Sequence, residues 1–263
     1  MERDACARFS AVEYTDQEHA VWRSAQRGDL DELQRRVLGY QEAGADPDKR
    51  KRALNLALKV AVWNEQVAAV ALLLDSNANP NDPQVFGFPW SLNALTKTHA
   101  DGRTIQLLVL HGAFLNRGSL YMAQTSAAVV ALTKAKADAD GTCYSARPLL
   151  RHCSEDPVHV DVVRTLLACK ANVNGADNPF GSTALHSVCR RPQARSICAL
   201  VHLLLRAKAN PCAETSGRET ARMLLARAEF AARARSGGRG GRITAALRLL
   251  SAAEHAHKAH YGD

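Results

Sequence analysis

The sequence predicts an all-α protein built as an array of helix-turn-helix repeats. Of its 263 residues, 46% are hydrophobic but only 5% are aromatic, and the abundance of Ala and Leu favours helices. An Ala followed by Asn or Asp recurs along the chain, and four of its five spacings lie close to 33 residues. A Leu-rich stretch precedes each occurrence. A helix pair of this size buries its apolar stripe only against neighbours of the same shape.

The clearest unit spans residues 180–212. Its first part, residues 181–186, predicts a turn that runs into a short helix, which Arg190-Arg191-Pro192 ends. The second helix carries apolar residues at i, i+3, i+4, i+7 and i+8, which place one stripe on one face. These are Ile197, Leu200, Val201, Leu204 and Leu205. The unit closes with a turn at Ala209-Asn210-Pro211.

Copies of this closing turn mark the other units. They are Ala45-Asp46, Ala78-Asn79, Ala113-Phe114, Ala137-Asp138 and Ala171-Asn172, with Phe114 in place of the polar residue. A period near 33 residues is typical of ankyrin repeats among helical repeat arrays.

The sequence resembles the ankyrin-repeat family at particular residues. Thr183-Ala184-Leu185-His186 stands where the family has T-P-L-H, and Arg147-Pro148-Leu149-Leu150 keeps only the Pro-Leu pair. His111-Gly112-Ala113 matches the close of the family's second helix. The resemblance covers about residues 18–258. It implies an all-α ankyrin-repeat solenoid with short hairpin loops, in which His186 braces a hairpin through backbone hydrogen bonds.

The resemblance and the spacing together give the expected organisation: a leader, six repeats, a degenerate C-terminal capping repeat and a short tail. The leader is 1–17, the repeats are 18–48, 49–81, 82–116, 117–140, 141–174 and 175–212, the cap is 213–258, and the tail is 259–263. The repeat at 117–140 is short. The cap contains a Gly/Arg-rich stretch, 233–242, that predicts a flexible loop between two helices.

A basic run, Lys49-Arg50-Lys51-Arg52, is expected in the first hairpin. A localisation signal and a contact with an acidic partner are both open for it, and a solvated loop is favoured. The formal net charge of +8 is likewise compatible with nucleic acid or acidic partners, although a solvated surface is the commoner explanation.

Chemical motifs are largely missing from the sequence. The glycines at 237–241 follow a helix and lack Gly-Lys-Ser/Thr, which argues against a phosphate-binding loop. His255 and His257 face apart on a helix, and Cys189 and Cys198 lack two further matched ligands, so no metal site is expected. We expect no cofactor and no catalytic residues.

The seven cysteines include no CxxC pair and are expected to be reduced core residues of an intracellular protein. No run of 18 apolar residues occurs, and the N-terminus does not resemble a secretory or transit signal. We therefore expect a cytoplasmic location, with the nucleus as the alternative.

The resemblance implies a non-catalytic adaptor or scaffold that binds a protein partner through the concave surface of hairpins and first helices. The chain itself is expected to be monomeric. Nucleic-acid or anionic-surface binding through 233–242 is one alternative, and a regulatory subunit of an enzyme is another. Expected partner contacts are aromatic anchors, polar hairpin residues and arginines: Phe86, Phe88, Asn81, Tyr144, Asn174, Asp177, Phe180, Arg190, Arg191 and Arg195. Phe114 and Trp90 are expected to pack between hairpins.

Overall fold

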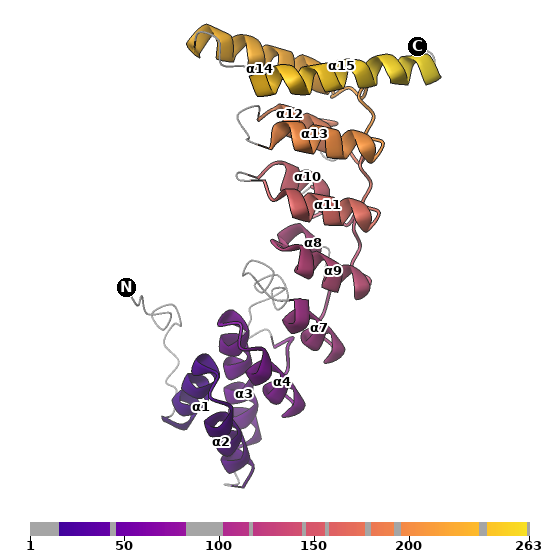
Figure 1. Ribbon diagram of the computed structural model, residues 1–263. Helices are drawn as coiled ribbons and strands as arrows, with labels where there is room; N and C mark the ends of the chain where they lie inside the picture. The colour runs from indigo at the N-terminus through magenta and orange to yellow at the C-terminus, as the bar shows by residue number, and fades with distance from the viewer. Residues whose placement is uncertain are drawn as a thin grey trace. The chain divides into compact units, whose positions relative to one another are not determined.

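The structure is a computed structural model, shown in Figure 1, and it is helical. It describes residues 16–42, 46–82, 102–115, 118–143, 146–155, 158–176, 180–191, 196–236 and 241–261. Within these ranges the chain forms thirteen helices, joined by turns that include two isolated bridges, Cys143–Ala146 and Glu214–Thr220. The predicted all-α class is confirmed.

The chain divides into two compact units. The first unit comprises Met1–Ser91 with Leu107–Phe114, and the second comprises Leu92–Gln106 with Leu115–Asp263. The helices of the first unit are α1 (Asp16–Arg27), α2 (Leu30–Glu42), α3 (Pro47–Trp63), α4 (Val67–Asp75) and the C-terminal end of α7 (Gly102–Leu110). In this unit α1 packs against α2 and α3, and α4 packs against α2 and α3.

The second unit is a stack of helix pairs. The first helix of each pair is α8 (Ser119–Met122), α10 (Pro148–Cys153), α12 (Ala184–Cys189) or α14 (Ala221–Ser236). The second helix is α9 (Ser126–Lys134), α11 (Val160–Ala168), α13 (Ile197–Arg206) or α15 (Gly241–Tyr261). Like helices of successive pairs pack on each other, so the pairs lie one above another in Figure 1.

A buried leucine and a buried or half-buried alanine close α4, α7, α9, α11 and α13 in the same way. The alanine N–H donates to the carbonyl of the leucine five residues earlier, and the residue before the alanine closes the adjacent bond of a Schellman motif. The leucine–alanine pairs are Leu73–Ala78, Leu108–Ala113, Leu132–Ala137, Leu166–Ala171 and Leu204–Ala209. The recurring alanine of the sequence is therefore the residue that ends the helix against the core.

The Schellman motif requires a left-handed residue just before the alanine. That residue is Asn77, Gly112, Lys136, Lys170 or Lys208, with φ between 65° and 80°. Glycine and asparagine enter this region at little cost, whereas other L-residues do so less readily.

One expected loop is helical, and so are the two ends of another. Lys49-Arg50-Lys51-Arg52 lies in α3, not in a hairpin, because Asp46 caps the helix by accepting a hydrogen bond from the Asp48 N–H at 3.1 Å and Pro47 occupies its first turn. In the stretch 233–242, α14 continues to Ser236 and α15 begins at Gly241. Only residues 237–240 of that stretch lie outside the described part of the chain. Arg, Lys and Ala are good helix formers, which is why composition alone misjudged residues 49–52 and the two ends of 233–242.

The left-handed backbone at Lys170 leads to a prediction about the free energy of unfolding. Lys170→Gly should change the free energy of unfolding by less than about 1 kcal/mol, because relief of the left-handed backbone offsets the added freedom of the unfolded chain. Lys170→Ile should destabilise by about 1–2 kcal/mol, since a β-branched residue is strained there. Urea unfolding of both variants measures this difference, and equal destabilisation would contradict the assignment.

Candidate functional site

The hairpins between successive helix pairs are held by side chains of Asn and Asp. In four of these turns the first polar residue accepts a hydrogen bond from the backbone N–H two residues later. The donor–acceptor distances are 2.9 Å from Asn81 to Asn79, 2.9 Å from Asp140 to Asp138, 3.0 Å from Asn174 to Asn172 and 2.9 Å from Cys212 to Asn210. This local turn fixes the course of each hairpin.

The second polar residue then reaches the backbone of the following repeat. Asn174 donates its amide to the Lys208 carbonyl at 3.1 Å and accepts from the Asn210 N–H at 2.7 Å. Asn81 does the same to the Gly112 carbonyl at 2.7 Å and the Phe114 N–H at 2.8 Å. We call these contacts inter-repeat brackets.

A charged residue makes a simpler bracket. The Asp140 carboxylate accepts the Asn172 N–H at 2.9 Å and lies 3.4 Å from the Arg147 guanidinium. Each bracket joins two backbones that are more than thirty positions apart in the sequence.

A buried histidine on α12 braces the hairpin between α13 and α14, as the family resemblance implies. The His186 Nδ1 accepts the Thr183 backbone N–H at 3.2 Å, so Nε2 carries the proton and donates to the carbonyls of Ala213 at 3.1 Å and Glu219 at 3.2 Å. The side chain is fully buried. Burial is the main cause that lowers the pKa of His186 below its ordinary value of 6.5.

Asn55 takes the equivalent place in the first unit, and the sequence analysis missed it. It is fully buried on α3, accepts the Asn79 N–H at 2.6 Å and donates to the Asp82 carboxylate. Arg52-Ala53-Leu54-Asn55 aligns with Thr183-Ala184-Leu185-His186, and both side chains bind a residue 27 positions later. This alignment of the two tetrapeptides is the sequence signal that could have identified Asn55.

The polar residues expected to bind a partner already bind the chain. In Asn81 and Asn174, one amide hydrogen and one carbonyl lone pair are used in the brackets. Each amide retains a second hydrogen and a second lone pair, so their role toward a partner stays a prediction.

Exposed apolar and basic residues lie before α12, just beyond its C-terminal end and along α14. Phe180 is 60% exposed, and both Arg190 and Arg191 at the end of α12 are exposed. On α14, Met223 and Phe230 are 51% and 78% exposed. We call these five residues the α12–α14 surface. The sequence analysis did not find Met223 and Phe230, although their spacing of seven places them on one side of α14.

Six of the residues named in the sequence analysis lie outside the described part of the chain, and the prediction for Phe114 was wrong. Phe86, Phe88, Trp90, Tyr144, Asp177 and Arg195 lie outside the described residues. Phe114, which was expected to pack between hairpins, is 73% exposed. It stands where Asn79, Asn172 and Asn210 stand in other repeats; its backbone N–H is bound by Asn81, but its side chain cannot accept the turn hydrogen bond that those asparagines accept.

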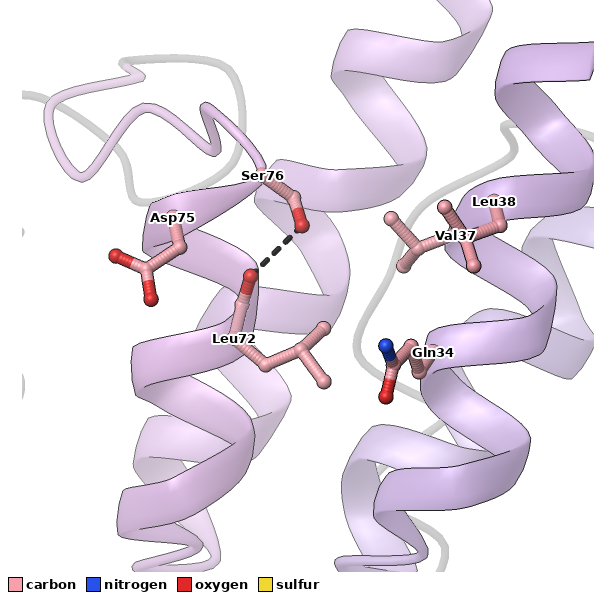
Figure 2. A pocket seen from close by; sticks show the side chains of 6 residues that line it. All are labelled: Gln34, Val37, Leu38, Leu72, Asp75 and Ser76. Carbon is pink, nitrogen blue, oxygen red and sulfur yellow. Dashed lines mark hydrogen bonds between the residues drawn. The ribbon is translucent and has the colours of Figure 1, made fainter.

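An open cavity of about 360 Å³ lies in the first unit between α2 and α4. Figure 2 shows its apolar lining, Val37, Leu38 and Leu72, beside the polar residues Gln34, Asp75 and Ser76. The Ser76 hydroxyl donates to the Leu72 carbonyl at 2.7 Å, and Asp75 lies 3.6 Å from His111. Asp75 is its one titratable lining residue, so the cavity suits an apolar side chain better than acid–base chemistry.

The remaining chemical groups are structural. Burial raises the pKa of Cys153 and of Cys189 to about 12, which keeps both thiols protonated and poorly nucleophilic. Among the described residues, no cluster of three His, Cys, Asp or Glu side chains is placed to hold a metal ion. No helix in that part of the chain is long and apolar enough to cross a membrane.

The buried histidine generates a pH prediction. Since folding lowers the pKa of His186, the unfolded chain takes up the proton more readily, and the contribution to stability is complete above about pH 6.5 and declines as the pH falls. Wild type should therefore lose more free energy of unfolding between about pH 7.5 and 5.5 than His186→Asn, which imitates Asn55. The exposed His255→Asn serves as control. Identical pH dependence of wild type and His186→Asn would contradict the assignment.

Comparison with solved structures supports the same architecture. The ankyrin repeat domain of Bcl-3, described as a unique member of the IkappaB protein family, is 21% identical with a TM-score of 0.64, over 87% of this chain and 97% of that one. The human ASB11 ankyrin repeat domain is 20% identical with a TM-score of 0.60, over 87% and 96%. No family model and no curated protein matches the sequence. Together with the repeated helix pairs and the bracketed hairpins, these likenesses show that the chain has the ankyrin-repeat fold.

Proposed function

We propose that this protein is a non-catalytic interaction module that binds a protein partner through its hairpins and first helices, as an adaptor or scaffold. The observation that carries the proposal is the exposure of Phe180 on a hairpin that the fold holds in place, together with two exposed arginines beyond the C-terminal end of α12. Aromatic residues and arginine are the side chains most often found at the centre of protein interfaces.

The surroundings of Phe180 hold its backbone in one conformation. Its carbonyl accepts the Ser216 N–H at 3.0 Å, and Gly181 adopts φ of 60°, which other residues rarely do. Thr183 and His186 then cap α12 reciprocally. A surface that is ordered before binding loses little conformational entropy when a partner docks.

The arginines extend this surface along the first helices. Thr183 and Thr220 precede α12 and α14 in the same way, so Arg190 and Arg227 occupy equivalent positions on adjacent helices. Arg227 pairs with Glu219 at 2.6 Å, whereas Arg190 and Arg191 are exposed beyond the end of α12. Carboxylates of a partner are the groups that these two arginines would bind.

The free cysteines favour a reducing compartment for this function. Six cysteines lie in the described residues, all are free, and four of them are partly exposed. Disulfides form readily in oxidising compartments, so we place the protein in the cytoplasm or nucleus, where thiols stay reduced. We propose that it acts as a monomer that contacts its partner through one face.

Affinity purification with mass spectrometry tests the proposal. Partners captured by wild type should be lost, at least about tenfold, with Phe180→Ala/Arg190→Ala/Arg191→Ala, because truncation of central interface residues costs more than 1 kcal/mol each. Phe114→Ala, which truncates an equally exposed aromatic residue in the first unit, should retain them. A parallel Phe86→Ala/Phe88→Ala variant tests the predicted anchors in the second hairpin.

Unchanged circular dichroism and melting temperature establish that each variant is folded. If every captured protein is retained by the triple variant, the α12–α14 surface does not bind the partner. If Phe114→Ala alone abolishes capture, the binding surface lies in the first unit.

A further inference from the structure

Three lysines occupy the same backbone position in three consecutive helix pairs of the second unit. Lys136, Lys170 and Lys208 each follow the C-terminus of a second helix, α9, α11 or α13, and each has φ of 65° to 67°. All three side chains are exposed. Because α9 packs on α11 and α11 on α13, the three positions form one row along the unit.

The fold does not require lysine at this position. It requires a left-handed residue, and glycine or asparagine supplies that at lower cost, as Gly112 and Asn77 do in the first unit. Lysine is thus present three times in succession where the backbone favours other residues. An unfavoured residue at a conformationally restricted position indicates a role for its side chain.

Five arginines of the second unit are paired with carboxylates, unlike these lysines. Arg147, Arg151, Arg164, Arg222 and Arg227 pair with carboxylates. Among the described residues, no ion pair involves Lys136, Lys170 or Lys208, or the flanking Lys134 and Arg206 at the last turns of α9 and α13. We call these five residues the lysine row.

Two acidic residues lie near the row: Asp138 and Asp140 both follow Lys136, and the Asp140 carboxylate accepts the Asn172 N–H, two residues beyond Lys170. Asp138 follows Lys136 closely and accepts the Asp140 N–H, while the equivalent residues in the next two repeats are the neutral Asn172 and Asn210. The row therefore keeps a net positive charge over all three repeats.

The spacing of the row matches an extended polypeptide. Packed helices lie about 8–10 Å apart, which sets the distance from one lysine position to the next. A segment in the extended polyproline II conformation advances about 3.1 Å per residue with three residues per turn, so every third residue of a bound peptide lies on one face, about 9 Å from the next, and would face successive lysines. We propose that the lysine row binds an extended acidic segment of a protein partner, with Asp or Glu at every third position.

The chemistry of the row favours a peptide over a nucleic acid. The helices α9, α11 and α13 contain no Phe, Tyr or Trp on which bases could stack. Four of the five basic groups are lysine point charges, which lack the planar fork of arginine that reads base edges. The lysine row lies at the C-terminal ends of the second helices and shares no residue with the α12–α14 surface, so the inference goes beyond the proposed function.

Fluorescence anisotropy with a labelled peptide of five Glu-Ser-Gly repeats tests this inference. The variant Lys136→Asn/Lys170→Asn/Lys208→Asn removes the charges and leaves residues that adopt the left-handed conformation readily, so the fold is retained. The control, Lys49→Asn/Arg50→Asn/Lys51→Asn, removes the same charge from α3 of the first unit. Melting curves of both variants confirm folding.

Wild type should bind the peptide more weakly as NaCl rises from about 50 to 200 mM, and the row variant should bind at least about tenfold more weakly than wild type. The control should stay within about twofold of wild type.

Equal loss in both variants would show that net charge alone attracts the peptide, and equal binding by the row variant and wild type would overturn the site. Tighter binding of oligothymidylate through the same lysines would overturn the choice of partner, and equal binding of a peptide with five contiguous Glu would overturn the spacing.

Failure of this test leaves the capture experiment on Phe180 unaffected, because that experiment changes no residue of the lysine row. Conversely, loss of the partner in the Phe180 variant leaves the peptide measurement interpretable.

Discussion

The inter-repeat bracket is the interaction on which the remainder of the structure depends. One short helix pair leaves an apolar stripe that only its neighbours can bury, so the repeats must stack in register. The Asn174 amide sets that register by binding both a carbonyl and an N–H of the next hairpin, and Asn81 repeats the arrangement in the first unit. Directional hydrogen bonds thus position surfaces that hydrophobic burial alone leaves free to slide.

The bracketing residues are brought into position because the helices α4, α7, α9, α11 and α13 all end in a Schellman motif. The Schellman motif places the buried alanine against the core and directs the following two residues into the turn. His186 and Asn55 then fasten the hairpin from the side of the first helix. The residues that remain outside this framework, Phe180 among them, are the ones available for recognition.

The architecture could be predicted from the sequence because its determinants are local and repeated. The alanine that closes each helix and the polar residue after it recur near a fixed period, and the structure explains both. Asn55 and Phe114 were harder to interpret, because one is a polar residue buried by a long-range contact and the other an aromatic residue that the backbone leaves exposed. The basic start of α3 was misjudged because charge suggested a loop, while the cap at Asp46 determines a helix. For the candidate site, sequence reasoning identified Phe180, Arg190 and Arg191 but not Met223 and Phe230, whose exposure depends on what packs against α14.

Native-state hydrogen exchange at the Asn210 N–H tests the bracket most directly. In Asn174→Ala, the account predicts at least about tenfold faster exchange at that amide and a loss of about 1–3 kcal/mol in the free energy of unfolding. Asn174→Asp should keep the amide protected, since Asp140 holds the Asn172 N–H with a carboxylate alone. Unchanged exchange and stability in Asn174→Ala would show that the repeats are held in register by packing and that the bracket is incidental.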